Sequence, residues 1–166
     1  DINPGPQPST PILLTPLPNG FLFRANDGTH GAELWISDGT APGTRMLRDI
    51  NLQGASEPMH LIAIGNRVFF NADDGVTGRE LWVTDGTEAG TYRIRDINGT
   101  GDSNPRYFTP FGNQVLFTAD DGQLGRELWV TDGTEPGTRL LADLEHGAAS
   151  SSPLEIVVAG STVFFV

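Results

Sequence analysis

A twelve-residue motif of the form ELWxxDGTxxGT occurs three times in this chain of 166 residues. Its copies begin at Glu33, Glu80 and Glu127, so each lies 47 residues after the one before it. No insertion interrupts the spacing. A fixed period of this size is typical of supersecondary units stacked side by side, and it constrains the fold more than any single residue does. The sequence therefore predicts a repeat architecture.

The repeat extends well beyond the motif. Three further features recur at matching phases: an Asp followed by Ile or Leu, a Ser with a Pro two residues later, and an apolar run. The four Asp positions are Asp1, Asp49, Asp96 and Asp143, and the four Ser positions are Ser9, Ser56, Ser103 and Ser151. We therefore expect one repeat domain over 1–166, with a partial repeat at 1–32, repeats at 33–79 and 80–126, and a partial repeat at 127–166. This makes about three and a half repeats.

The stretch from Thr91 to Gly137 shows the expected elements of one unit. Its apolar and polar residues alternate in short runs, which predicts strands at 91–97, 106–111, 114–119 and 126–131. Gly112 and Asn113 form a two-residue hairpin turn between the middle two strands, with equivalents at 19–20, 65–66 and 160–161. The Pro-Gly pairs at 42–43 and 136–137 fit type II turns with glycine at positive φ. No window has a helical period.

Four short antiparallel strands in each unit describe a blade of a β-propeller. Strand 67–72 carries large apolar residues on both faces, which suits a sheet packed between two neighbours. The alternative is a β-trefoil, which also has three four-stranded repeats. A trefoil contains a whole number of repeats, whereas the second and third strands of this unit occur a fourth time. The sequence therefore predicts an all-β, propeller-like array.

Composition narrows the class of partner. The chain has a net charge of −11, all ten of its basic residues are Arg, and it has no Cys. An acidic surface repels phosphate backbones, so we expect no nucleic-acid partner. The absence of Cys excludes disulfides and thiolate chemistry. No apolar run approaches the roughly 20 residues that span a bilayer, so membrane insertion is not expected.

The residues resemble a known family. The motif from Glu80 to Thr91, its two copies, and the preceding segment 70–79 are similar to the ELWxxDGT repeat family of bacterial secreted and surface proteins. This resemblance covers essentially the whole chain, although the first copy departs at 26–27 and 36–37 and the fourth stops before its motif. It implies a tandem β-repeat array, exported from the cell to the surface or the extracellular space. It implies no catalytic residues.

Two residue types recur within the motif and mark the anchors of each repeat. They are Trp35, Trp82 and Trp129, and, two positions earlier on the same strand face, Glu33, Glu80 and Glu127. Each Trp is interpreted either as a packing anchor between blades or as a stacking platform for sugars, and recurrence at one phase favours packing. Each Glu either lines a site or holds the structure by hydrogen bonds and a pair with Arg of an adjacent blade. The structural role is favoured.

The acidic hairpin turns raise the question of calcium. Asp73 and Asp74, and Asp120 and Asp121, precede a Gly, as Asn26 and Asp27 do. Ca²⁺ binds six to eight oxygen ligands, which such turns supply in part. Asp-Gly also suits a tight turn without any metal. Calcium at Asp73, Asp74, Asp120 and Asp121 therefore stays a hypothesis, and no other cofactor is expected.

Catalysis has little support in the sequence. His30, His60 and His146 lie at three different repeat phases, and we interpret each as a surface or loop residue. No nucleophile, metalloprotease or phosphate-binding motif is present. We expect a non-catalytic recognition or adhesion module, in one version a lectin with a shallow glycan site in each repeat. The alternatives are a structural component that assembles chain to chain, or continues in a longer array, and a part of a propeller enzyme.

Overall fold

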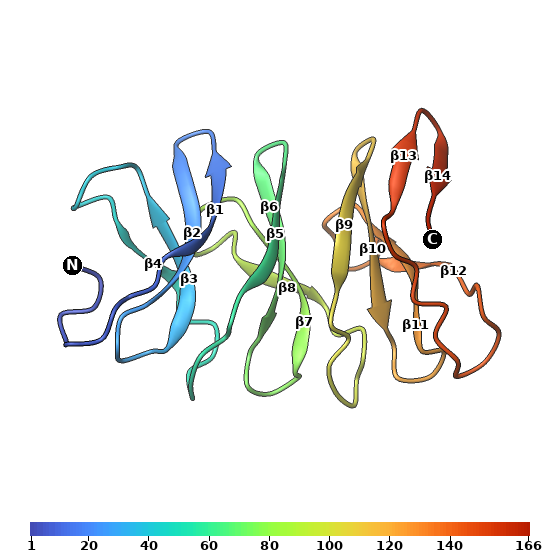
Figure 1. Cartoon of the computed structure of the whole chain (residues 1–166), viewed down its shortest axis with the longest axis horizontal. Helices are drawn as coiled ribbons and strands as arrows, with labels where there is room; N and C mark the ends of the chain where they lie inside the picture. Colours follow the sequence, from blue (N-terminus) through green and yellow to red (C-terminus); the bar gives the residue numbers. More distant parts are fainter.

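The computed structural model describes residues 1–166 and contains only β-strands and loops. Three four-stranded antiparallel sheets follow one another along the long axis of the molecule, and a two-stranded hairpin lies at the C-terminal end (Figure 1). Each sheet is formed by strands that are consecutive in the sequence. The prediction of tandem four-stranded antiparallel repeats is therefore confirmed.

The strands are short and occur at the same phases in each repeat. The first sheet consists of β1 (Ile12–Leu17), β2 (Gly20–Asn26), β3 (Ala32–Ser37) and β4 (Arg45–Arg48). The second consists of β5 (Met59–Ile64), β6 (Arg67–Asp73), β7 (Arg79–Thr84) and β8 (Tyr92–Arg95). The third consists of β9 (Arg106–Phe111), β10 (Gln114–Asp120), β11 (Arg126–Thr131) and β12 (Arg139–Ala142), and the hairpin of β13 (Val157–Ala159) and β14 (Thr162–Phe164).

The sheets do not begin and end where the unit expected at 91–137 does. The strand near Thr91 closes the second sheet as β8, because β8 pairs with β7. The motif therefore runs from the third strand of each sheet towards the fourth. As a result the chain contains three complete sheets, followed by the first two strands of a fourth unit.

The hairpin turns follow the sequence with one exception. Phe111 pairs with Gln114 across the two-residue turn, and Gly112 there has a φ of 60°. In the first repeat Leu17 pairs with Gly20, so the turn lies at 18–19 rather than at 19–20. Pro110 is in β9, an edge strand of its sheet, where the missing N–H of proline is tolerated.

The second sheet packs one face against the first sheet and the other face against the third. In β6, Phe70 packs towards the first sheet with Leu34 and Trp82, whereas Phe69 packs towards the third sheet with Phe117 and Trp129. Successive residues of a strand point to opposite faces, so an apolar run supplies both interfaces at once. Burial of apolar area between sheets is therefore what joins the repeats.

The first strands of neighbouring sheets lie side by side: β1 contacts β5, β5 contacts β9, and β9 contacts β13. Arginine side chains instead connect the fourth strand of one sheet to the next sheet. Arg48 donates to the carbonyl of Thr91 at 2.5 Å, and Arg95 donates to that of Thr138 at 2.7 Å. No strand of one sheet pairs with a strand of another. A trefoil requires such pairing, so that alternative was wrong. None of the elements is a helix that would be able to cross a membrane.

Candidate functional site

The motif glutamates are fully buried and bind the chain that leads to the next sheet. Glu80 accepts hydrogen bonds from the amide of Ile97 at 2.9 Å, the amide of Ser103 at 3.0 Å and the hydroxyl of Ser103 at 2.6 Å. Equivalent bonds reach Glu33 from Ile50 and Ser56, and Glu127 from Leu144 and Ser151. The sequence suggested arginine partners, but backbone amides and a serine occupy those positions.

Burial changes the acidity of two of these carboxyl groups. It raises the pKa of Glu33 and of Glu80 to about 7, and the hydrogen bonds from serine and backbone amides offset only part of that rise. A raised carboxyl pKa often marks a catalytic acid. These side chains are 0 % exposed, however, and no substrate atom would reach them. The geometry therefore assigns them to the scaffold.

The tryptophans are also enclosed. Trp82 and Trp129 are each 5 % exposed and Trp35 is 8 % exposed. Trp82 packs on Phe70, and Trp129 on Phe117, with ring centroids 6.4 Å apart in both pairs. Their indole N–H groups have no hydrogen-bond partner. Since the ring faces are covered by neighbouring residues, no sugar is able to stack on them as the alternative interpretation required.

In each DGT loop a glycine lies close against the carboxylate of the motif aspartate, and the sequence did not show this contact. Asp85 accepts bonds from the amide of Thr87 at 2.9 Å and from its hydroxyl at 2.7 Å, and these two bonds lower the pKa of Asp85. A Cβ on Gly90 would overlap the Asp85 carboxylate, and Gly43 and Gly137 stand in the same relation to Asp38 and Asp132. None of these three glycines has a positive φ. The type II turn prediction was therefore wrong, and glycine is required for space.

In the acidic hairpin turns, the carboxylates accept hydrogen bonds from backbone amides of the same turn. Asp73 accepts the amide of Gly75 at 2.7 Å, and Asp74 accepts those of Val76 at 2.9 Å and Thr77 at 2.7 Å. Burial raises the pKa of Asp74, but the bonds from Thr77 and Val76 outweigh it and the pKa is lowered. Asp120 and Asp121, like Asn26 and Asp27, repeat the pattern. No three His, Cys, Asp or Glu side chains converge on a position for a metal. Calcium at these turns therefore stays a hypothesis, and any such site would need backbone carbonyl groups as further ligands.

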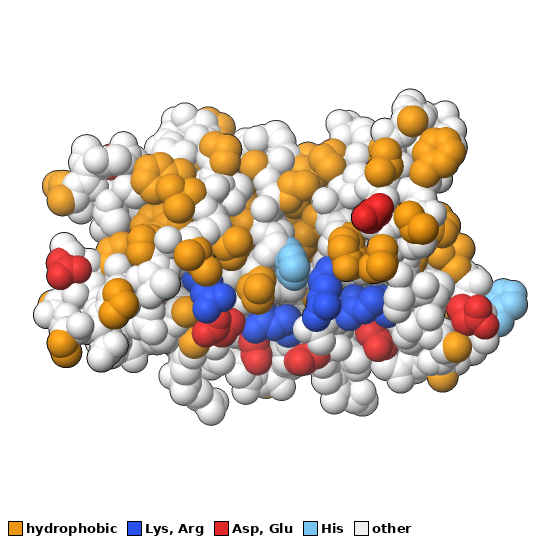
Figure 2. Space-filling model, viewed as in Figure 1, with side chains coloured by type: hydrophobic (Ala, Val, Ile, Leu, Met, Phe, Trp, Pro, Cys, Tyr) orange, Lys and Arg blue, Asp and Glu red, His pale blue; other side chains and the backbone are white.

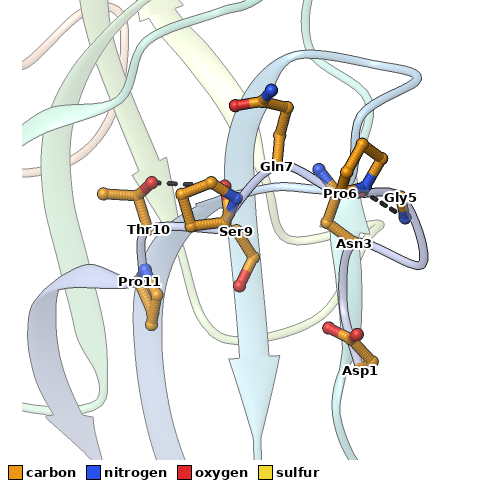
Figure 3. A pocket seen from close by; sticks show the side chains of 9 residues that line it. Asp1, Asn3, Gly5, Pro6, Gln7, Ser9, Thr10 and Pro11 are labelled. Atoms are coloured by element: carbon orange, nitrogen blue, oxygen red, sulfur yellow. Dashed lines mark hydrogen bonds between the residues drawn. The ribbon is translucent and has the colours of Figure 1, made fainter.

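A hollow of about 500 Å³ lies inside the N-terminal segment 1–11 (Figure 3). One looped stretch forms it, and the side chain of Asn3 there accepts the amide of Gly5 at 2.9 Å. Asn3 also lies against Gly28, just as Asn51 lies against Gly75 in the next repeat. The hollow is thus bounded by a contact that recurs in the scaffold, and its only apolar lining is the rings of Pro6, Pro8 and Pro11.

A different cavity lies between the first strands of the second and third sheets. This β5–β9 groove has a volume of about 350 Å³ and is lined by His60, Leu61, Ile62, Arg106, Tyr107 and Phe108. Ile62 and Phe108 pack against the core beneath, so they form an apolar floor. Arg106 and Tyr107 are exposed at the rim, as is His60. An apolar floor with a few polar groups is the usual make-up of a small-molecule site.

The backbone of the groove is irregular at both rims. His60 has a φ of 57° and Tyr107 a φ of 56°, and each lies where the register of its strand shifts by one residue. Such β-bulges turn side chains out of the regular alternation and are common beside binding sites. A non-glycine residue at positive φ costs about 1–3 kcal/mol and occurs often at functional sites.

Arginines gather around this groove, and they appear across the middle of the face shown in Figure 2. Arg79 donates to the carbonyl of Glu57 at 2.7 Å, and Arg126 to that of Asn104 at 2.8 Å. Burial lowers the pKa of Arg126, and the charge of Arg106 lowers it further. Arg106 itself makes no hydrogen bond, and none of these three arginines has an ion pair.

Sequence reasoning missed this groove, because it treated His60 as a loop residue out of phase with the other histidines. One signal was available. One position with positive φ recurs in the four repeats and is occupied by Leu13, His60, Tyr107 and Glu155, and the position before it by Ile12, Met59, Arg106 and Leu154. These positions differ in every repeat, while the Ser, Glu, Trp and Asp that build the sheets stay constant.

No protein-family model matches the chain, and no curated protein matches it.

Proposed function

We propose that this chain is a non-catalytic recognition or adhesion module of the bacterial cell surface or extracellular space. Its sheets act as the blades of a propeller-like array, and its ligand binds along the row of first strands. Three features support the proposal: blades that pack face to face, first strands that lie side by side, and the resemblance of the motif to secreted repeat proteins. The ligand class that we propose is a glycan.

The observation that carries this proposal is the contrast between constant and variable positions. Glu80 and Trp82 recur in each motif and are buried. His60 and Tyr107 are exposed and differ from their counterparts Leu13 and Glu155, while the positive φ is common to all four positions. A scaffold that keeps its interior constant and varies an exposed row of bulged residues has the organisation of a binding surface.

A glycan array followed by calorimetry tests the proposal. The purified chain is expected to bind at least one saccharide class, and Tyr107→Gly is expected to weaken that binding while the unfolding curve stays two-state. Glycine accepts the positive φ at this position, so the variant removes the side chain and keeps the bulge. A control is Val76→Gly, at a loop residue that is 80 % exposed and does not line the groove. Absence of binding to every saccharide on the array would refute glycan recognition.

A second candidate, chain-to-chain assembly, is favoured by the apolar faces at the two ends. At one end the cluster of Phe23, Ala25 and Trp35 is buried with Ile2 packed against it, but Leu14, which lines a pocket with Phe23, is 64 % exposed. At the other end Leu141 and Leu144 are each 40 % exposed. Their counterparts Leu47 and Ile94, and Ile50 and Ile97, lie between sheets and are 2–7 % exposed.

Light scattering after size exclusion distinguishes this candidate from the first. Assembly predicts a mass that rises with concentration, and Leu141→Glu should abolish that rise because it places a charge in the contact. Leu52→Glu, at a residue 83 % exposed in a loop, is the control. A monomer at every concentration would contradict assembly and leave glycan recognition standing.

A further inference from the structure

Within the proposed glycan recognition, on which this inference rests, we propose that the β5–β9 groove binds a carboxylate-bearing saccharide. Arg106 pairs with the carboxylate, and the sugar ring lies on the apolar floor against Tyr107. The site is single in this chain and is not repeated in every unit.

The charge of the groove points to an anion. The chain carries a net charge of −11, yet Arg79, Arg106 and Arg126 lie near one another and none of them is in an ion pair, although the charge of Asp120 acts on Arg126. Like charges in proximity destabilise one another unless an anion is shared between them. In the first repeat Arg24 pairs with Glu57. One repeat later these two positions hold Asn71 and Asn104, so this ion pair has no counterpart beside the groove.

Arg106 has the geometry to use this charge. It is exposed and makes no hydrogen bond or ion pair of its own, so its donors are available. A guanidinium presents parallel N–H groups that match the two oxygens of a carboxylate. Arg79 and Arg126 already donate to carbonyl groups. They add positive electrostatic potential to the groove rather than a direct contact with the ligand.

The remaining wall and the floor suit a sugar ring. Tyr107 is 42 % exposed and presents an aromatic ring with a polar tip, and Leu61, Ile62 and Phe108 provide apolar surface. Partial burial, and then the charges of Arg106 and Arg79, lower the pKa of His60. A neutral imidazole offers one donor and one acceptor to sugar hydroxyl groups. The volume of about 350 Å³ lies at the small end of ligand pockets and fits about one ring.

The neighbouring junctions lack this chemistry. Between β1 and β5 the first strand contributes Ile12 and Leu13, which are apolar. Just before β13 the equivalent position with positive φ is Glu155, which would repel a carboxylate. Selectivity for an anionic sugar therefore arises only where β5 meets β9.

Calorimetry with defined oligosaccharides tests the inference. The probes are trigalacturonate and a glucuronate-containing tetrasaccharide, with the neutral galactose trisaccharide and inorganic sulfate as comparisons. We expect at least one acidic saccharide to bind at least about 10-fold more tightly than either comparison, because hydrogen bonds to charged groups contribute the difference. Arg106→Gln should reduce its affinity by about 10-fold or more, and Arg139→Gln, which removes the same charge from the outer strand β12, should leave it unchanged.

The outcomes separate this inference from the proposal beneath it. If neutral saccharides bind as well as acidic ones, or if Arg106→Gln and Arg139→Gln behave alike, the acidic site is wrong while glycan recognition stands. If sulfate binds as tightly as either acidic saccharide, the groove binds an anion without recognising the sugar ring, and the inference is again wrong. If no saccharide binds, both proposals fall.

Discussion

The hydroxyl of Ser103 donates to Oε2 of Glu80 at 2.6 Å, across 23 residues of sequence. Glu80 lies in β7, the third strand of the second sheet, and Ser103 lies in the loop that leads to β9, the first strand of the third. The same carboxylate also accepts two backbone amides. One buried side chain therefore holds the connection between two sheets in place, and the structure repeats it at each junction.

Replacement of this carboxylate is expected to destabilise the fold. In Glu80→Gln the amide NH₂ would face a backbone N–H in either orientation, which leaves a buried donor without a partner and costs about 2 kcal/mol. Urea unfolding measures the change, and Glu88→Gln, in an exposed loop position, is the control. A loss no greater than that of the control would show that the buried bonds do not stabilise the junction.

Stability is expected to fall as the pH rises through neutrality. The pKa of Glu33 and Glu80 is about 7 in the folded state, against 4.5 when exposed. Between these values the folded state binds more protons than the unfolded state, so the free energy of unfolding decreases as pH increases. The loss is on the order of 3 kcal/mol for each carboxyl group over the full window. Below about pH 4.5 both states are protonated and this dependence ends.

Urea titrations from pH 5 to pH 8 measure this slope. The double variant Glu33→Gln/Glu80→Gln has no carboxyl group at these positions, so its stability should be lower at pH 5 and flatter towards pH 8. An equal slope in the two proteins would mean that other groups cause the dependence.

The close approach in the DGT loop predicts non-additive substitutions. Gly90→Ala places a methyl group against the Asp85 carboxylate and should cost about 2 kcal/mol by displacing it. Once Asp85→Ala has removed that carboxylate, the same glycine substitution should cost little more. A double-mutant cycle measures the coupling. Gly99→Ala is the control, since nothing lies near its Cβ position, and purely additive effects would contradict the steric explanation.

Because the indole N–H of Trp82 has no hydrogen-bond partner, we expect the fold to tolerate a smaller aromatic ring at this position. Its N–H has no partner, so Trp82→Phe loses only packing area and should cost about 1–2 kcal/mol. Trp82→Ala, which leaves a cavity between two sheets, should cost about 3–5 kcal/mol. Thermal unfolding measures both. Equal costs for the two variants would indicate that the indole N–H contributes a bond.

The bulge in β1 predicts an unusual response to glycine. Leu13 has a φ of 60° and is partly exposed, so Leu13→Gly relieves backbone strain and should leave stability unchanged or raise it by up to about 1 kcal/mol. The neighbouring Leu14→Gly, where φ is negative, should lower stability by about 1 kcal/mol through added chain entropy. Similar losses in both variants would rule out strain at Leu13.

Local patterns in the sequence predicted much of the fold. The 47-residue spacing from Glu33 to Glu80 and to Glu127 indicated equal units. Alternating residues placed the strands, and turn dipeptides such as Gly112-Asn113 placed most hairpins. These signals are local because a strand and its hairpin partner are close in sequence. The fourth strand was assigned to the wrong unit, since its composition does not show whether it pairs backward or forward.

The binding groove could not be predicted in this way. His60 and Arg106 are 46 residues apart and meet only because two first strands lie side by side. Each of these residues is unremarkable in its own repeat. The space that Gly90 must leave for Asp85 was equally hidden, because it depends on the path of the loop rather than on a φ preference.

The sequence alone determined that this chain forms repeated antiparallel sheets with apolar residues on both faces, since hydrophobic period and turn chemistry act over a few residues. Tertiary structure decided which strand closes each sheet, where each motif carboxylate finds its donors, and which side chains line the β5–β9 groove. Those features depend on how one sheet packs against the next, and that packing brings together residues from different repeats.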